Sequence, residues 1–237
     1  MADGTVLVPP RILELRQNIL KKNDLLARDL RQRFAEAGVY VLNLVSGPGA
    51  GKTRLLQRTL TELAPEFHMA TLVGDLATQN DARRLQESGT TVRQIETGTL
   101  CHLEAEMVAS YVQDWNLAEI DLLFIENVGN LVCPSSYDLG EDGRVVLFST
   151  TDGEDKPLKY PTLINSADLA IISKLDLAEA AEFDHAAMHR ALREMRPDIK
   201  ILELSAKTGE GLEAWYSHLR SSIEAKKEAS HVSGNPR

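Results

Sequence analysis

The chain alternates short apolar runs with longer stretches in which apolar residues recur every three or four positions. The apolar runs that have the length of strands lie at 41–46, 68–73, 91–95, 122–125, 144–149, 169–172 and 199–204. Helical spacing is found at 12–34, 55–63, 80–88, 100–112, 183–195 and 212–223. Strands that alternate with helices along the whole length predict a mainly parallel sheet covered by helices on both faces.

The two ends of the chain differ from this pattern. Residues 1–8 carry no clear signal, whereas Pro9-Pro10 precede an amphipathic helix that Gly38 is suited to end. We expect this N-terminal helix to pack on the side of the domain rather than to bind a partner. The polar segment 224–237 predicts a disordered tail. Without an internal repeat or a linker, the 237 residues predict a single domain, 1–237.

The first apolar run leads into a glycine-rich segment that a helix follows. The segment fits the pattern G-x-x-x-x-G-K-[ST] in its expected context. Its glycines let successive backbone N–H groups point at one anion, and the helix N-terminus adds its positive dipole end. Lys52 can reach the β- and γ-phosphates, and the Thr53 hydroxyl can bind Mg²⁺. The predicted phosphate-binding residues are Gly47, Pro48, Gly49, Ala50, Gly51, Lys52, Thr53 and Arg54.

Two carboxylates follow predicted strands and complete this site. Asp75 ends the second strand and Glu126 the fourth, at the sheet edge where ligands bind in open α/β folds. We expect both to hold Mg²⁺ with Thr53, and to act in catalysis with Lys52. Glu126-x-x-Gly129 resembles the Asp-x-x-Gly switch of GTPases, in which the glycine N–H contacts the γ-phosphate.

Two later segments resemble the base-reading loops of GTPases. Ser173-Lys174-Leu175-Asp176 is similar to Asn-Lys-x-Asp, in which the aspartate accepts two hydrogen bonds from guanine and the lysine stem covers the base. Ser205-Ala206-Lys207 is similar to the loop whose backbone contacts the guanine oxygen, so Ser205 and Ala206 are predicted to bind the nucleotide. Ser173 departs from the pattern, and we expect its short side chain to lose the brace that asparagine gives the phosphate loop.

Composition narrows the setting. No apolar run is as long as a membrane span and no apolar signal segment begins the chain, which predicts a cytosolic protein. The net charge of −9 argues against a nucleic-acid surface. Both cysteines, Cys101 and Cys133, follow predicted strands at the nucleotide edge, and His102 adjoins the first. Thiolate and imidazole suit Zn²⁺ or Ni²⁺, although small buried cysteines are an open alternative.

Taken together, these motifs resemble the HypB family of hydrogenase nickel-incorporation GTPases, which have the SIMIBI type of P-loop fold. The similarity spans about residues 10–222. It rests on the phosphate loop, on 74–82, on the Cys101-His102 segment, on 126–134 and on the charged loop 153–161. The resemblance implies a GTP-hydrolysing metallochaperone that helps deliver nickel to [NiFe]-hydrogenase. It also implies a HypA-like accessory partner, and the hydrogenase large subunit as an indirect one.

The same resemblance implies a metal site at a homodimer interface that the nucleotide promotes, with ligands matching Cys101, His102 and Cys133. Some family members carry an N-terminal cysteine motif or a histidine-rich stretch. The six histidines here are scattered, so we do not expect nickel storage.

Three other functions stay open at the level of sequence. A urease-type nickel GTPase is the nearest, but its Cys-Pro-His arrangement is absent. A small-molecule kinase would need an acceptor site and an arginine-rich lid. A pure metal-binding module would not need the intact Lys52, Thr53, Asp75 and Glu126. Comparing GTP with ATP turnover separates the two GTPases from the other two.

Overall fold

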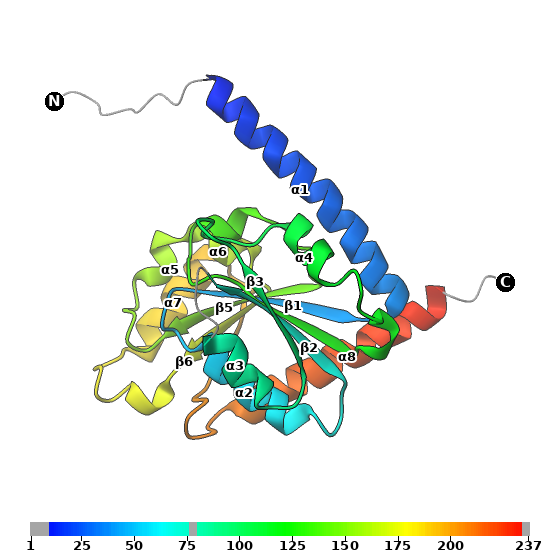
Figure 1. Cartoon of the computed structure of the whole chain (residues 1–237). Coiled ribbons are helices and arrows are strands. Elements are labelled where there is room, and N and C mark those ends of the chain that lie inside the picture. The colour runs from blue at the N-terminus through cyan, green and yellow to red at the C-terminus, as the bar shows by residue number, and fades with distance from the viewer. Residues whose placement is uncertain (1–9, 76–79, 234–237) are drawn as a thin grey trace.

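The computed structural model describes residues 10–75 and 80–233, and a seven-stranded parallel sheet forms its centre (Figure 1). The spatial order is β3-β2-β4-β1-β5-β6-β7. The strands are β1 Tyr40–Ser46, β2 Met69–Asp75, β3 Thr91–Glu96, β4 Leu122–Glu126, β5 Gly143–Ser149, β6 Leu169–Ser173 and β7 Lys200–Glu203. Because β1 lies between β4 and β5, the order reverses beside it, and such a point is where open parallel sheets bind ligands.

Helices cover both faces of the sheet, which confirms the predicted α/β class. The α-helices are α1 Pro10–Ala37, α2 Lys52–Leu63, α3 Asn80–Gln86, α4 Ala105–Tyr111, α5 Lys156–Lys159, α6 Pro161–Ser166, α7 His185–Met195 and α8 Leu212–Ser233. Three short 3-10 turns are η1 Leu117–Glu119, η2 Cys133–Ser136 and η3 Leu175–Leu177. Within the described residues, none of the helices has both the length and the apolar character needed to cross a membrane.

Alternation along the strands decides which helix covers which face. In β4, Leu122 and Phe124 pack in one core with residues of α2 and α8, while Leu123 and Ile125 pack in another with residues of α1 and α4. A third core, which includes Phe148 of β5, lies under α6 and α7. The strands are therefore buried on both sides, as continuous apolar runs predict.

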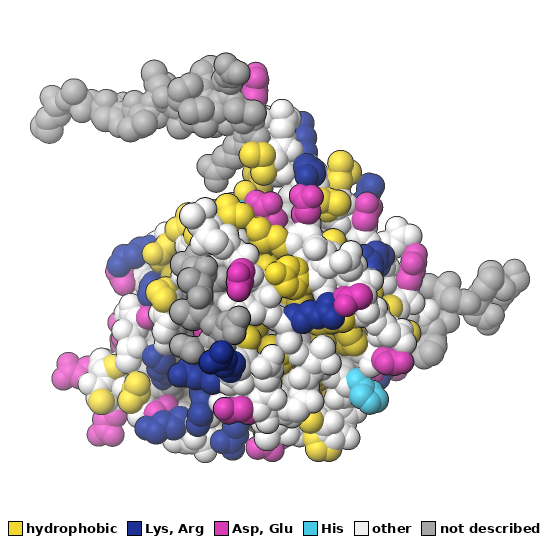
Figure 2. Space-filling model, viewed as in Figure 1, with side chains coloured by type: hydrophobic (Ala, Val, Ile, Leu, Met, Phe, Trp, Pro, Cys, Tyr) yellow, Lys and Arg dark blue, Asp and Glu magenta, His cyan; other side chains and the backbone are white. Residues whose placement is uncertain are grey.

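Helix α1 packs on the sheet only by its C-terminal half. Ala27, Leu30 and Phe34 of the C-terminal half are buried in the core, whereas Ile19, in the N-terminal half, is 51% exposed. Figure 1 shows the N-terminal half projecting from the body, and Figure 2 shows hydrophobic side chains exposed along it. The prediction of a helix packed on the domain's side is thus correct for the second half alone.

Two predicted boundaries were wrong. Helix α8 continues to Ser233, so residues 224–233 are helical rather than a disordered tail. Polar contacts explain this, since Lys226 pairs with Asp142 at 2.5 Å and Lys227 with Asp121 at 2.6 Å. The charged loop 153–161 also contains the short helix α5. The expectation for residues 1–8 lies outside the described residues, and the single domain stays a prediction.

The third difference concerns the segment before α4. A helix was predicted from Leu100, but α4 begins at Ala105, so Cys101 and His102 lie in a loop. The backbone N–H of Leu103 donates to Asn127 Oδ1 at 3.4 Å, and that of Ala105 donates to Asn23 Oδ1 at 2.9 Å. Side chains from elsewhere in the fold thus take the hydrogen bonds that an earlier helix start would have needed.

One buried hydrogen bond offers a test of the packing between α2 and α8. The Trp215 indole N–H donates to Thr59 Oγ1 at 2.9 Å, and both side chains are 0% exposed. We expect Thr59→Val to lower the free energy of unfolding by about 1–3 kcal/mol, because it leaves a buried donor without a partner. Thr61→Val is the matched control. The hydroxyls of Thr59 and Thr61 each donate to the carbonyl oxygen four residues earlier, but Thr61 is exposed. Urea unfolding that shows equal losses for both variants would contradict this account.

Candidate functional site

The phosphate loop lies between β1 and α2, at the centre of the sheet. Gly49 and Gly51 have φ angles of 77° and 100°, which only glycine adopts without strain, so the backbone can curl into an anion cradle. Lys52 begins α2 and is buried, with its Nζ donating to Ser46 Oγ at 2.9 Å. Burial lowers the pKa of Lys52, and the Glu126 carboxylate opposes that shift.

The predicted magnesium ligands converge on the same edge. Glu126 pairs with Leu44 of β1 in the parallel register, which places its carboxylate beside the start of α2. Thr53 Oγ1 donates to Glu126 Oε1 at 2.7 Å, so the structure brings these two residues together. Asp75 ends β2, the strand next to β4, but its side chain lies outside the described residues.

Gly129 follows β4 and lies against the phosphate loop. A Cβ at this position would come within 3.1 Å of the Pro48 Cα and 3.3 Å of the Pro48 nitrogen. Such an approach is closer than side chains normally tolerate, so glycine is needed for the backbone to lie flat on the loop. The predicted switch segment therefore touches the phosphate-binding segment directly.

Of the residues predicted to read the base, Lys174, Asp176 and Ala206 line a cavity of about 470 Å³ beside the phosphate loop, together with Arg54. Ser205 is fully buried and is not among the lining residues. Asp176 Oδ1 accepts a hydrogen bond from Ser205 Oγ at 2.6 Å, and Lys207 Nζ lies 3.4 Å from its other oxygen. The Ser205 hydrogen bond, aided by the Lys207 charge, lowers the pKa of Asp176. The carboxylate is thus held ionised, as an acceptor for two N–H donors must be.

Lys174 has a left-handed backbone at φ 62°, a conformation that side chains rarely adopt. The Thr150 hydroxyl donates to its carbonyl oxygen at 2.9 Å and helps to hold it there. Strained backbone of this kind concentrates at functional sites. It lies one residue after Ser173, at the mouth of the cavity that Asp176 also lines.

The expectation for Ser173 was wrong. Its hydroxyl donates to the carbonyl oxygen of Ala50, in the phosphate loop, at 2.6 Å. Ser173 is 4% exposed and is the last residue of β6, two strands from β1. The shorter side chain therefore still braces the loop, because the strand end lies close enough for a hydroxyl to reach.

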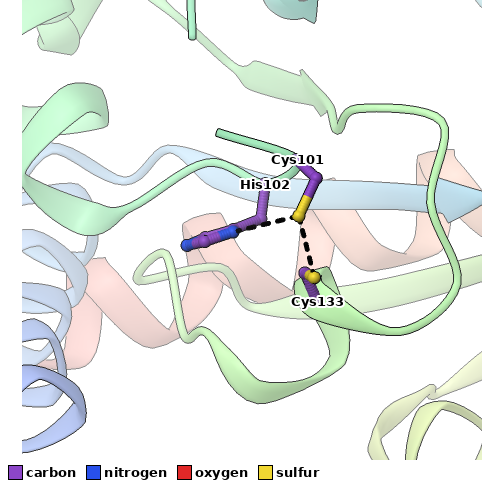
Figure 3. A group of neighbouring side chains, drawn as sticks. All are labelled: Cys101, His102 and Cys133. Carbon is purple, nitrogen blue, oxygen red and sulfur yellow. Dashed lines mark hydrogen bonds between the residues drawn. The ribbon is translucent and has the colours of Figure 1, made fainter. Parts of the chain in front are cut away.

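Cys101, His102 and Cys133 form the group in the described residues that could hold a metal ion, and their ligand atoms lie within 4.8 Å of one another (Figure 3). The two sulfurs are 2.8 Å apart, and His102 Nδ1 is 3.9 Å from Cys101 Sγ. Hydrogen bonding to Cys133, with burial, raises the pKa of the Cys101 thiol. Two sulfurs bound to one tetrahedral ion at about 2.3 Å would lie about 3.8 Å apart.

Neighbouring side chains orient the histidine. Its ring stacks on Tyr137 with a centroid distance of 3.9 Å, and its Nε2 lies 3.4 Å from Glu104 Oε1. Nε2 is buried and makes no hydrogen bond, while Nδ1 is the ring nitrogen that faces Cys101. Soft sulfur and borderline imidazole donors fit Ni²⁺ or Zn²⁺ and fit Mg²⁺ poorly.

Sequence reasoning missed several polar residues near these sites. Asn43 is 0% exposed in the middle of β1, and Asn127, Glu141 and Arg144 are also buried. The signal was present, because a polar residue inside an apolar strand must find a partner there. Glu104 and Tyr137 carried no comparable signal, since their roles depend on how two loops meet.

A parallel sheet with this loop at its centre defines a nucleotide-binding protein of the P-loop type. The family described as "CobW/HypB/UreG, nucleotide-binding domain" matches residues 40–203. The hydrogenase maturation factor HypB of Rhizobium leguminosarum bv. viciae is 47% identical over 210 residues, covering 88% of this chain and 70% of that protein. The hydrogenase/urease maturation factor HypB of Helicobacter pylori is 41% identical, covering 90% of this chain and 87% of that protein.

A solved structure agrees with these relatives. The crystal structure of HypB from Helicobacter pylori in complex with nickel superposes with a TM-score of 0.81 at 40% identity. That similarity covers 87% of this chain and 97% of the other. The chain therefore belongs to the HypB family, within the larger CobW/HypB/UreG group.

The base cavity gives the first test of the site. We expect the wild type to bind GTP more tightly than ATP, and Asp176→Asn to weaken GTP by about 10- to 150-fold, since hydrogen bonds to a charged group contribute about 1.5–3 kcal/mol. The variant should gain affinity for xanthosine triphosphate, whose edge accepts where guanine donates.

The matched control is Glu179→Gln, which removes an exposed carboxylate three residues further along and outside the residues lining the cavity. Nucleotide titrations check both variants. Equal GTP and ATP affinity in the wild type would contradict the assignment of Asp176.

Proposed function

We propose that this protein is a GTP-hydrolysing nickel metallochaperone that assists nickel insertion into [NiFe]-hydrogenase. The observation that carries the proposal is the Cys101, His102 and Cys133 group. Cys133 lies in the same segment as Gly129, the switch residue that contacts the phosphate loop. Nickel is the cargo, and a HypA-like accessory protein and the hydrogenase large subunit are the partners along its route. The predicted cytosolic location stays a prediction.

The nucleotide half of the proposal rests on the geometry of the phosphate edge. Lys52 neutralises the β- and γ-phosphates, while Thr53, Asp75 and Glu126 hold Mg²⁺ directly or through water. Glu126 accepts a hydrogen bond from the Thr53 hydroxyl, so two of the groups that would hold Mg²⁺ lie together. Asp176 selects guanine. The chemical step is the transfer of the γ-phosphoryl group to water, with its charge stabilised by these fixed groups.

The metal half calls for a second copy of the chain. Three donors in one chain leave a tetrahedral ion one ligand short. A two-fold axis close to the group would bring the same donors from the partner, because a symmetric interface presents the same patch twice. Exposed hydrophobic side chains lie next to both cysteines, with Leu100 37% and Val132 61% exposed, and these suit burial between two copies.

The two halves act as one switch. The γ-phosphate and Mg²⁺ order the segment from Glu126 to Gly129, and hydrolysis releases it. Cys133 lies four residues beyond Gly129 and begins η2, so the position of its sulfur follows the nucleotide state. Because one ion binds both sulfurs, a small displacement of either loop changes nickel affinity.

A second candidate function differs in the enzyme that receives the nickel. The Helicobacter pylori relative is named for both hydrogenase and urease maturation. A urease-type role for this chain would use the same nucleotide and nickel chemistry and differ only in the acceptor. Measuring nickel transfer to purified apo-hydrogenase and to purified apo-urease, each with its own accessory proteins, distinguishes the two functions.

The proposal predicts that nickel binding needs all three donors and responds to the nucleotide. We expect Cys101→Ala, His102→Ala and Cys133→Ala each to weaken nickel by at least about tenfold, because each removes a direct ligand. In the wild type, nickel affinity should differ between GDP and a non-hydrolysable GTP analogue. Nickel should then change the ratio of GTP-analogue affinity to GDP affinity by the same factor. Calorimetric titration in both nucleotide states provides the measurement.

His68→Ala serves as the control for loss of an imidazole, since His68 immediately precedes β2 at the opposite edge of the sheet and its side chain is 89% exposed. Nickel binding that survives in all three donor variants would place the site elsewhere. Equal nickel affinity in both nucleotide states would leave a metal site without the switch.

A further inference from the structure

A chain of buried polar side chains runs beneath the loops that carry the three metal donors. Its members are Asn43 in β1, Asn127 after β4, and Glu141 and Arg144 around the start of β5, with exposed fractions of 0%, 2%, 8% and 7%. Burying two amides and two charges destabilises a fold unless every group finds a partner. The contacts made by these four residues are therefore specific, and some of them link into one continuous path.

The first part of the path joins the magnesium end to the loop of Cys101 and His102. Asn127 directly follows Glu126, and its backbone N–H donates to the Leu44 carbonyl in β1 at 3.0 Å. The Asn127 side-chain oxygen accepts the N–H of Leu103 at 3.4 Å. Leu103 is 0% exposed and packs against Gly74, where a Cβ would be only 2.9 Å from its side chain. The residue after His102 is thus held between β2 and Asn127.

The second part of the path reaches the turn of Cys133. Asn127 Nδ2 donates to Asn43 Oδ1 at 3.3 Å, and Asn43 Nδ2 donates to Glu141 Oε1 at 3.0 Å. The same Glu141 oxygen accepts Arg144 Nη2 at 2.6 Å. Arg144 then donates to the carbonyl oxygens of Ser135 at 3.2 Å and Tyr137 at 2.8 Å.

These last two acceptors belong to the metal site's surroundings. Ser135 lies in η2, which Cys133 begins, and Tyr137 stacks on His102. Both halves of the donor group are therefore tied to one buried network, and Asn127 is its member closest to the predicted magnesium ligand. Rigid, fully hydrogen-bonded networks transmit a displacement instead of absorbing it.

We propose that Asn127, relayed by Asn43, is the positioning residue that couples the nucleotide state to the spacing of the nickel donors. This inference rests on the proposed function. If Glu126 gave up the Thr53 hydroxyl to hold Mg²⁺, Asn127, the next residue, would move with it. Its side chain would then shift Leu103 on one side and, through Asn43, Glu141 and Arg144, the Cys133 turn on the other. The spacing of the two sulfurs then changes, because Leu103 holds the segment of Cys101 and Arg144 the turn of Cys133. Asn130 also links these segments, through the Cys101 carbonyl oxygen and the Val132 N–H.

The test is the ratio of nickel affinity with a GTP analogue to that with GDP, measured in the full-length chain. We expect Asn127→Ala to bring this ratio to within about twofold of one, against the 5- to 150-fold range typical of coupled sites. Nickel affinity with GDP and affinity for the GTP analogue should each stay within about threefold of the wild-type values. Replacing a residue that merely supported the fold would change the nickel and nucleotide affinities but would leave the ratio of nickel affinities in the two nucleotide states unchanged.

Two further variants keep the test decisive. Ser166→Ala is the matched control, because Ser166 Oγ accepts a hydrogen bond from Arg144 at 3.1 Å but lies off the path between Asn127 and the donors. It should preserve the ratio. If Asn127→Ala does not fold, Asn43→Ala tests the same path, because it breaks both relay hydrogen bonds and leaves the Asn127 oxygen on Leu103, so the ratio should again fall.

The possible outcomes distinguish a failure of this inference from a failure of the proposed function. A wild type whose ratio differs from one, with a folded Asn127 variant that keeps the same ratio, would overturn the inference alone. A wild type with a ratio of one would overturn the proposed function as well.

Discussion

The parallel pairing of β4 beside β1 is the constraint on which the rest of this structure depends. It places Glu126 next to Leu44 and so beside the start of α2, where Thr53 hydrogen-bonds to it. The same pairing lays Gly129 flat on Pro48. A carboxylate and a glycine three residues apart thereby face one phosphate-binding loop, and everything that follows them, Cys133 included, begins from a position that this loop determines.

The sequence predicted the parts of the site that depend on local pattern. The phosphate loop needed only a strand, glycines and a helix in succession, and Asp176 was predicted from the resemblance of residues 173–176 to Asn-Lys-x-Asp after a strand. The seven strands were recognisable because buried parallel strands are apolar on both faces. The pairing of Cys101 with Cys133 was within reach too, since both segments begin at strand ends that share an edge.

The remaining features depend on contacts between distant segments, which no local pattern reports. Ser173 was expected to lose its brace, and only the closeness of the β6 end to Ala50 shows that a hydroxyl suffices. The late start of α4 follows from hydrogen bonds to Asn127 and Asn23, residues distant in sequence. Helix α8 continues past Ile223 because Lys226 and Lys227 form salt bridges with aspartates that directly precede β5 and β4.

The central claim is that the nucleotide and the metal act on one assembly of two chains. Sedimentation velocity of the wild type with GDP or a non-hydrolysable GTP analogue, each with and without nickel, tests it most directly. The account predicts mainly monomer with GDP, a larger dimer fraction with the GTP analogue, and the largest when nickel is added, because bound ligands stabilise the state that binds them better. The same sedimentation profile under all four conditions would contradict it.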